Sequence, residues 1–375
     1  MAVLTEDQAM LRDAAVDWGR EQAPVDALRR LRDAGASSGF DAETWSGMAQ
    51  MGFPGVMAPE AAGGAGLDLT AMGLVLEALG RTLAASPLLS TGVIGVVALT
   101  RGGSEAQKAE WLPKFAAGEA VAALALEEGP RHEPLATTLA ARREGDGYVL
   151  DGAKTFVLDG VEADVLIVAA RESGAPGEAE GIVLLLVPAD TSGIARERLD
   201  LIDSRGAGAI RFEGVRVPAE AALIGGAGLL EHVLDAARAA LAAEMLGQAA
   251  SAFEQTLDYL KTRTQFGQLI GGFQALQHRA AKMFTAIELA RSAVERALRS
   301  VQEDRPDAPA AASLAKALAG DALHLVSNDM VQMHGGIGMT DAHDAGLFLK
   351  RARVAEAAFG GQAYHRDRWA RLHGF

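Results

Sequence analysis

The spacing of apolar residues changes twice along the chain. Up to about residue 119 they recur at helical intervals, as Leu74, Val75 and Leu79 do, and this period predicts helices. Between residues 120 and 222 shorter runs and alternation, as in Ile210 and Phe212, predict strands. Helical spacing then returns and continues to the C-terminus. The pattern predicts an α+β fold with a helical domain at 1–119, a β domain at 120–222 and a second helical domain at 223–375.

Several runs predict single elements. The apolar run from Ile182 to Val187 indicates a strand, and the Gly-, Pro- and Glu-rich stretch from Glu172 to Gly181 indicates a solvated connection before it. The run from Leu88 to Thr100 is far shorter than the roughly 20 apolar residues of a membrane span, so it predicts a buried helix. Turns are predicted at Gly271-Gly272 and from Glu303 to Pro309, where glycine, charge and proline interrupt the helical period.

Composition and charge narrow the classes of partner. The chain has 375 residues, 49% of them hydrophobic, with a formal net charge of -14. A polyanion is repelled by nucleic acid and by anionic membranes, so neither is expected as a partner. The absence of cysteine excludes disulfides, a thiolate nucleophile and cysteine-bound zinc. Residues 1–8 lack the basic start and apolar stretch of a secretory signal, so the expected location is the cytoplasm.

Two short segments in the last third combine residue types that suit the pyrophosphate of a nucleotide. They are Arg263-Thr-Gln-Phe266-Gly267 with Gln274, and Gln332-Met-His-Gly335-Gly336. A guanidinium binds two phosphate oxygens at once, and glycines let backbone N–H groups approach a ligand closely. Arg263 is alternatively a surface ion-pair residue, and His334 is alternatively a packing residue. No metal site is expected, because no histidine has metal-ligand spacing to other ligand residues.

These two segments, together with the order of helices, strands and helices along the chain, resemble the acyl-CoA dehydrogenase family. The resemblance spans nearly the whole chain, and its further matching positions are Trp45, Gly52, Pro59-Glu60-x-x-Gly63-Gly64-x-Gly66, Gly152-x-Lys154, Ala163-Asp164 and Val215-x-Val217-Pro218. It implies an N-terminal α-helical domain, a middle β-barrel and a C-terminal four-helix bundle. It also implies a dimer or tetramer, with FAD between subunits, an acyl-CoA substrate and a separate electron acceptor.

The resemblance assigns roles to the matching residues. Arg263, Phe266 and Gln274 are expected to reach the FAD of a neighbouring subunit, while Gln332, Gly335 and Gly336 contact it within the same assembly. Members of the family remove a proton beside the thioester carbonyl with a glutamate, while a hydride leaves the next carbon for flavin N5.

The glutamate expected from the resemblance is absent. The family's Tyr-Glu-Gly-Thr segment corresponds to Ala358-Phe359-Gly360-Gly361, so Phe359 occupies the usual position of the base. A phenyl ring accepts no proton at any pH. Some members carry the glutamate just before an arginine that matches Arg238, and Ala237 stands there.

Two positions on the flavin-ring side also depart from the family. The Thr-Glu-Pro-Gly-x-Gly-Ser segment corresponds to Glu127–Glu133, and the Trp-x-Thr that points a hydroxyl at flavin N5 corresponds to Phe156-Val157-Leu158. Both threonines are lost, so the ring-binding half is predicted to be degraded while the nucleotide-binding half is intact. The chain is therefore expected to complete the site of a partner.

Three functional hypotheses follow. The first is a subunit that supports α,β-desaturation of an acyl-CoA in a hetero-oligomer with a homologous catalytic subunit. The second is a self-sufficient homo-oligomeric dehydrogenase that uses Glu244 as a displaced base, although a glutamate there alternatively hydrogen-bonds within the bundle. The third is a scaffold without flavin. The remaining histidines, including His278, His343 and His365, are expected to be solvated surface residues.

Overall fold

The computed structural model describes residues 4–35 and 38–375, and the chain folds into two compact units. The helical unit is made of the chain up to Arg30, Leu69–Ala84 and Arg238–Phe375. The mixed unit is made of Leu31–Asp68 and Ala85–Ala237. Each unit therefore combines segments that are distant in the sequence.

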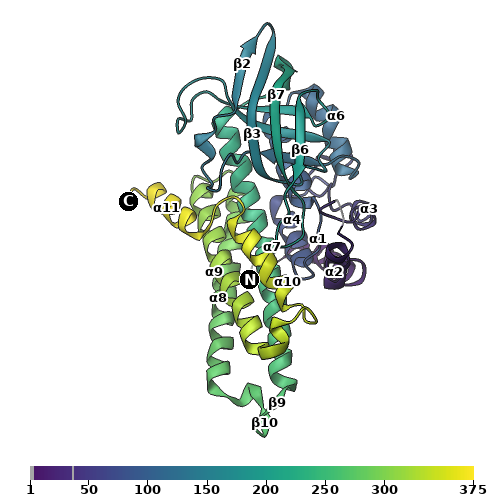
Figure 1. Cartoon of the computed structure of the whole chain (residues 1–375), viewed down its shortest axis with the longest axis vertical. Coiled ribbons are helices and arrows are strands. Elements are labelled where there is room, and N and C mark those ends of the chain that lie inside the picture. Colours follow the sequence, from purple (N-terminus) through teal and green to yellow (C-terminus); the bar gives the residue numbers. More distant parts are fainter. Residues whose placement is uncertain (1–3, 36–37) are drawn as a thin grey trace. The chain divides into compact units, whose positions relative to one another are not determined.

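Long helices build the helical unit, and Figure 1 shows α8 and α9 side by side with the β9–β10 hairpin at one end of the bundle. Its elements are α1 (Glu6–Gln22), α4 (Leu69–Gly80), most of α7 (Gly226–Thr262), β9 (Thr264–Gln265), β10 (Gln268–Leu269), α8 (Gln274–Gln302), α9 (Ala308–His334), α10 (Ala345–Ala357) and α11 (Gln362–Leu372). Helix α2 (Val25–Asp33) begins in this unit and ends in the mixed unit. A single 3₁₀ turn, Ile270–Gly272, precedes α8, and the turn before α9 places Pro309 in its first helical turn. The two turns predicted from glycine, charge and proline are confirmed.

Glycines set how closely α4 approaches its neighbours. A Cβ on Gly247 of α7 would lie 1.9 Å from the carbonyl oxygen of Glu77, and one on Gly80 would lie 2.3 Å from that of Glu244. On the α8 side, a Cβ on Gly73 would meet Leu298 at 2.5 Å. No side chain fits at these contacts, so the absence of a Cβ is what allows α4 to pack directly on both helices.

The mixed unit consists of short helices and an eight-stranded sheet. Its strands follow the order β6-β7-β3-β2-β4-β5-β8, and β1 pairs with β4 in parallel. Its elements are α3 (Ala42–Gln50), the π-helical turn η2 (Leu89–Gly95), α5 (Val96–Gly102), α6 (Glu105–Ala116), β1 (Ala122–Ala125), β2 (Ala140–Glu144), β3 (Gly147–Leu158), β4 (Val165–Arg171), β5 (Ile182–Pro188), β6 (Ile194–Arg198), β7 (Ala207–Pro218) and β8 (Ala222–Leu223). Most neighbouring strands are antiparallel.

The elements that were predicted in this unit are present. The run from Ile182 to Val187 lies in β5 and is buried, and the stretch from Leu88 to Thr100 forms buried π- and α-helical turns. The polar connection between β4 and β5 is held by Arg171, whose buried guanidinium donates to backbone carbonyls that include those of Glu178 and Glu180. A helical domain, a β domain and a second helical domain follow one another along the sequence, which confirms the predicted fold class. The domain boundaries at residues 119 and 222 stay a prediction.

Candidate functional site

The first predicted segment forms an exposed hairpin at the end of α7. Strands β9 and β10 pair antiparallel and leave Phe266 and Gly267 as a two-residue loop, with φ of 54° and 79°. Positive φ at both central residues matches the right-handed twist of the flanking strands, but it costs a non-glycine residue about 1–2 kcal/mol. Phe266 is also 91% exposed. The ring of Phe266 is therefore accessible to a ligand or a partner.

The polar side chains of the two segments are exposed and available. Arg263, Gln274 and Gln332 are all exposed. Among residues 4–35 and 38–375, none supplies Arg263 with an ion-pair partner or either glutamine side chain with a hydrogen bond. Most arginines of this acidic chain pair with a carboxylate, so an arginine without such a partner is suited to an external anion.

The second segment begins where α9 ends. Gly335 has φ of 63°, and a Cβ built on Gly335 or Gly336 would meet nothing within 4 Å. The backbone of this turn is therefore open to a ligand or a partner.

A stack of rings brings the two segments together. The ring of His334 lies 4.4 Å from that of Tyr259 on α7 and 4.3 Å from that of His343. Its Nδ1 donates to the carbonyl of Met330 at 2.7 Å, and burial lowers the pKa of His334. Because Tyr259 lies one helical turn before Arg263, this stack places both segments at the same end of the bundle. The geometry fits the packing alternative for His334.

The loop that carries Phe359 is fixed by three buried basic side chains. Nζ of Lys316 donates to the carbonyls of Ala355, Glu356 and Gly360 at 3.0, 3.1 and 3.2 Å. The carbonyl of Phe359 accepts from Arg238 Nε at 3.4 Å and from His365 Nε2 at 3.1 Å.

Burial lowers the pKa of Lys316 to about 7, with the positive charges of Arg238 and Arg351 acting in the same direction. Phe359 itself has φ of 55°. The loop is therefore held in a defined, strained conformation that presents no carboxylate at Phe359.

His365 corrects one sequence expectation. It was expected to be a solvated surface residue, yet it is fully buried, because its ring turns inward to the Phe359 carbonyl. His278, on α8, is exposed as predicted, whereas His343 is partly buried against the ring of His334.

Glu244 lies in a buried ion pair. Its Oε1 accepts from Arg351 Nη2 at 3.0 Å and Nε at 3.2 Å, and from Gln248 Nε2 at 2.9 Å. Arg351 belongs to α10, so the pair joins α7 to α10 within the helical unit. This contact fits the bundle hydrogen bond that was the alternative to a base. A catalytic role of Glu244 stays a hypothesis.

In the mixed unit, the acidic side chains of the segment predicted to match the ring-binding loop, residues 127–133, form internal contacts. Glu128 pairs with the buried Lys154 at 2.7 Å and also accepts from the backbone N–H groups of Thr138 and Leu139 at 2.8 Å. Burial acts to raise the pKa of Glu128, but Lys154 and the hydrogen bonds outweigh it and lower the pKa overall. Burial lowers the pKa of Lys154 to about 8. Glu127 is bound by His132 Nδ1 at 2.5 Å.

The other ring-side segment lies in a β-bulge. The register of β3 on β7 shifts between Lys154 and Val157, and Phe156 between them has φ of 49°. Bulges of this kind redirect side chains and occur beside active sites. Leu158, which the resemblance predicts to stand in place of a threonine, has a side chain that offers no hydrogen-bond donor. Three of the candidate site segments, those around Phe156, Phe266 and Phe359, thus contain a phenylalanine with positive φ.

Sequence reasoning did not identify Lys316, Tyr259 or Arg351 as residues of this region. Each is a single polar or aromatic residue in a long helix, where spacing alone does not distinguish a buried side chain from a solvated one. The alanines beside Lys316 in Ala315-Lys316-Ala317 lie on other faces of the helix, so they give no signal of its burial.

Comparisons with known proteins show the family to which the chain belongs. Three family descriptions match in order: acyl-CoA dehydrogenase N-terminal domain at residues 5–119, middle domain at 127–215 and C-terminal domain at 225–372. The chain belongs to the acyl-CoA dehydrogenase family. It is thus a member of a family of FAD-dependent oxidoreductases.

Individual relatives match over almost the whole chain. Mitochondrial isovaleryl-CoA dehydrogenase of Pongo abelii is 32% identical over 372 residues, which cover 95% of this chain and 86% of the relative. The structure of the ChsE4-ChsE5 complex from Mycobacterium tuberculosis matches with a TM-score of 0.91 and 28% identity over 100% of both chains. A Tcur3481-Tcur3483 steroid ACAD variant matches with a TM-score of 0.90 and 32% identity over 98% of both chains.

The residues present fit only part of an FAD molecule. The free guanidinium of Arg263 and the open backbone at Gly335 and Gly336 suit its pyrophosphate and adenosine. Leu158 and Phe359 do not suit its ring and the associated proton transfer. No group of three or more metal-ligating side chains occurs in the described part of the chain, and none of its helices is long and apolar enough to cross a bilayer.

Proposed function

We propose that this chain is a subunit of a hetero-oligomeric acyl-CoA dehydrogenase and completes an FAD site whose catalytic base lies in a homologous partner subunit. The assembly oxidises an acyl-CoA to the enoyl-CoA. When bound, FAD supplies the acceptor for the hydride that leaves the β-carbon. This chain binds the nucleotide half of that cofactor.

One observation supports the proposal: the two segments that we assign to nucleotide binding lie exposed at one end of the bundle, while the loop that the resemblance aligns with the usual base presents Phe359. In the proposal Arg263 binds the pyrophosphate, Phe266 packs on the adenosine half, and Gln274 and Gln332 donate to the same half. The glycine turn at Gly335 lets its N–H groups approach the cofactor. Because these side chains are exposed, the proposal assigns them to a cofactor seated on a neighbouring subunit.

Two of the similar structures are complexes of differently named components. The ChsE4-ChsE5 complex and the Tcur3481-Tcur3483 steroid ACAD both have two-part names. This likeness supports a two-component assembly for the present chain and makes a steroid or branched acyl-CoA a reasonable first substrate class. An electron-transfer flavoprotein is the acceptor that we expect, and the cytoplasm is the location that we expect.

The proposal is tested by comparing the chain alone with the chain in a complex. The chain is expressed alone, and also together in turn with each acyl-CoA dehydrogenase homologue of its genome that retains the glutamate lost at Phe359. Alone, it should contain little FAD, and neither isovaleryl-CoA nor a steroid acyl-CoA should bleach flavin absorbance anaerobically. One coexpressed pair should copurify with FAD and oxidise an acyl-CoA. Flavin bleaching by the chain alone would contradict the proposal.

Arg263→Ala in the copurified pair isolates the contribution of this chain. Loss of a charge-assisted phosphate contact should weaken FAD binding by at least about tenfold. Arg305→Ala is the matched control, because Arg305 is a half-exposed arginine that pairs with Glu303. It lies beyond the other end of α8, and the length of this helix at 1.5 Å per residue places it about 40 Å from Arg263. Equal FAD content in both variants would exclude the role assigned to Arg263.

The second candidate is a self-sufficient enzyme with Glu244 as the base. Glu244→Gln then abolishes turnover by the chain alone while flavin remains bound. In our proposal the pair of Glu244 with Arg351 is structural, so the variant lowers thermal stability, and the copurified complex that remains folded keeps its rate per bound flavin. A scaffold without flavin is the third candidate, and a preparation that stays colourless with every homologue supports it.

A further inference from the structure

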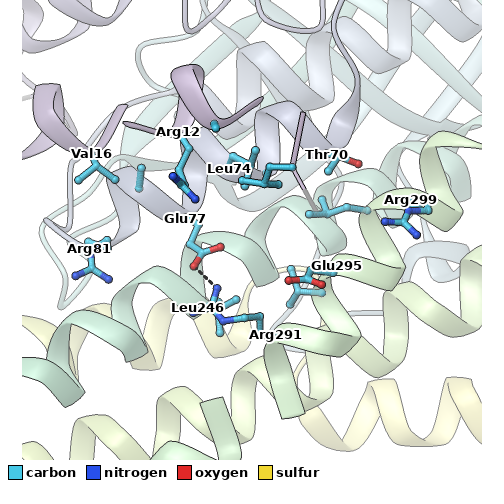
Figure 2. A pocket seen from close by; sticks show the side chains of 16 residues that line it. Arg12, Val16, Thr70, Leu74, Glu77, Arg81, Leu246, Arg291, Glu295 and Arg299 are labelled. Atoms are coloured by element: carbon cyan, nitrogen blue, oxygen red, sulfur yellow. Dashed lines mark hydrogen bonds and ion pairs between the residues drawn. The ribbon is translucent and has the colours of Figure 1, made fainter. Parts of the chain in front are cut away.

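A pocket lies in the helical unit between α1, α4, α7 and α8. Its volume is about 480 Å³, which is within the range of small-molecule sites. Figure 2 shows Thr70 and Arg299 at one end and Arg81 at the other, with Leu74 and Leu246 between them. None of the residues assigned above to nucleotide binding lines it.

The pocket arises from the way the helices pack. Helices α4 and α8 run antiparallel, because Leu69 N–H donates to Gln302 at 2.8 Å while Glu77 pairs with Arg291 at 2.6 Å. Their facing positions at helical spacing form two walls, and residues of α1 form a third. The arginines of the lining are Arg12, Arg81, Arg291 and Arg299.

The lining combines an apolar body with a positive rim. Four arginines stand against Glu77 and Glu295, a formal charge of +2 within a chain of -14. Arg291 is held by Glu77, and Arg81 pairs with Glu254. Arg299 is exposed and forms no ion pair with any residue in the described ranges. Since Thr70 lies at the same end, this end of the pocket offers a guanidinium and a hydroxyl to one anionic group.

We propose that this pocket binds a medium-chain carboxylate, with its head group at Arg299 and Thr70 and its alkyl chain along Val16, Leu74 and Leu246. A planar carboxylate accepts two N–H donors of a guanidinium, and an apolar chain gains from leaving water. The pocket is suited to the free acid rather than to a CoA thioester, which has no carboxylate at its acyl end. The inference is independent of the proposed function.

The position of the pocket separates it from the Glu244 pair. Leu246 faces the pocket, whereas Glu244, two positions earlier on α7, faces Arg351. Two residues correspond to a rotation of about 200° around a helix. A ligand in the pocket therefore touches the opposite face of α7 and does not compete for that ion pair.

Titration calorimetry of the full-length chain with decanoate, below its critical micelle concentration, tests the proposal. One decanoate should bind per chain, and 1-decanol, which keeps the chain but lacks the charge, should bind at least about tenfold more weakly. Arg299→Gln should weaken decanoate about tenfold and leave 1-decanol unchanged. Arg296→Gln is the matched control, because Arg296 lies on the same helix, is exposed and does not line the pocket.

Leu74→Trp tests the cavity separately by filling it, and should abolish binding of both ligands. Circular dichroism checks that Leu74→Trp folds. If Leu74→Trp does not fold, Arg299→Gln still tests the proposal, because an exposed arginine is dispensable for packing. The proposal is overturned by the absence of decanoate binding, by equal affinity for decanoate and 1-decanol, or by decanoate binding that Arg299→Gln leaves unchanged. FAD content and turnover do not enter these measurements, so their outcome is separate from that of the proposed function.

Discussion

Replacement of Lys316 by methionine should change how the stability of the protein depends on pH. Lys316 is fully buried beneath the Phe359 loop, and burial lowers its pKa from 10.5 in the unfolded chain to about 7. Between these values the unfolded state holds a proton that the folded state has released. The free energy of unfolding therefore rises with pH across this window, because the unfolded state binds more protons. The gain is complete above pH 10.5 and absent below pH 7.

The size of the effect follows from these two pKa values. Linkage gives a gain of about 2 kcal/mol between pH 7 and pH 9 for the wild-type chain. Lys316→Met lacks this contribution but keeps every other titrating group, so the difference between wild type and variant isolates it. The variant also leaves three carbonyls without their donor, which should destabilise it at every pH by a constant amount.

Urea unfolding followed by circular dichroism at pH 7, 8 and 9 measures this difference. The stability of wild type relative to Lys316→Met should increase by about 2 kcal/mol across the series. Lys350→Met, which removes an exposed lysine of α10, is the matched control and should show no such trend. A difference that is constant with pH would mean that Lys316 keeps its ordinary pKa, and a difference that shrinks would reverse the sign of the reasoning.

Two further predictions concern a buried ion pair and a close contact between helices. Glu128→Gln leaves the buried ammonium of Lys154 without its carboxylate and should lower the free energy of unfolding by about 3 kcal/mol. Urea unfolding at pH 7 measures this change, and a loss below about 1 kcal/mol would show that the ion pair does not stabilise the fold. Gly247→Ala forces a methyl group to within 1.9 Å of the Glu77 carbonyl and should cost about 2–3 kcal/mol. Gly346→Ala is the matched control, because Gly346 lies in a helix with open space around it, and this variant should be neutral or stabilising by up to about 1 kcal/mol. Equal melting temperatures for the two alanine variants would contradict the close approach of α4 and α7.

The sequence predicted the fold because its periodicity is strong and local. Helical spacing around Leu74 and the apolar run at Ile182 specify their elements without reference to distant residues. The hairpin at residues 263–269 was not predicted, because Phe266 favours negative φ and only the paired strands show that it takes the positive φ of a two-residue turn with Gly267. The absence of a glutamate at Phe359 is also a fact of sequence alone, because no folding can give a phenyl ring a proton-accepting group.

What the sequence could not decide is which polar residues become buried and which partners they find. Glu244 and Arg351 are more than 100 residues apart, and only the packing of α10 on α7 converts them from two surface charges into a buried pair. The inward turn of His365 and the burial of Lys316 were decided in the same way, as was the pocket whose walls come from four helices. The physical reason is that helical and strand periods are set by neighbours along the chain, whereas burial, charge pairing and cavities depend on surfaces that meet only after distant segments pack.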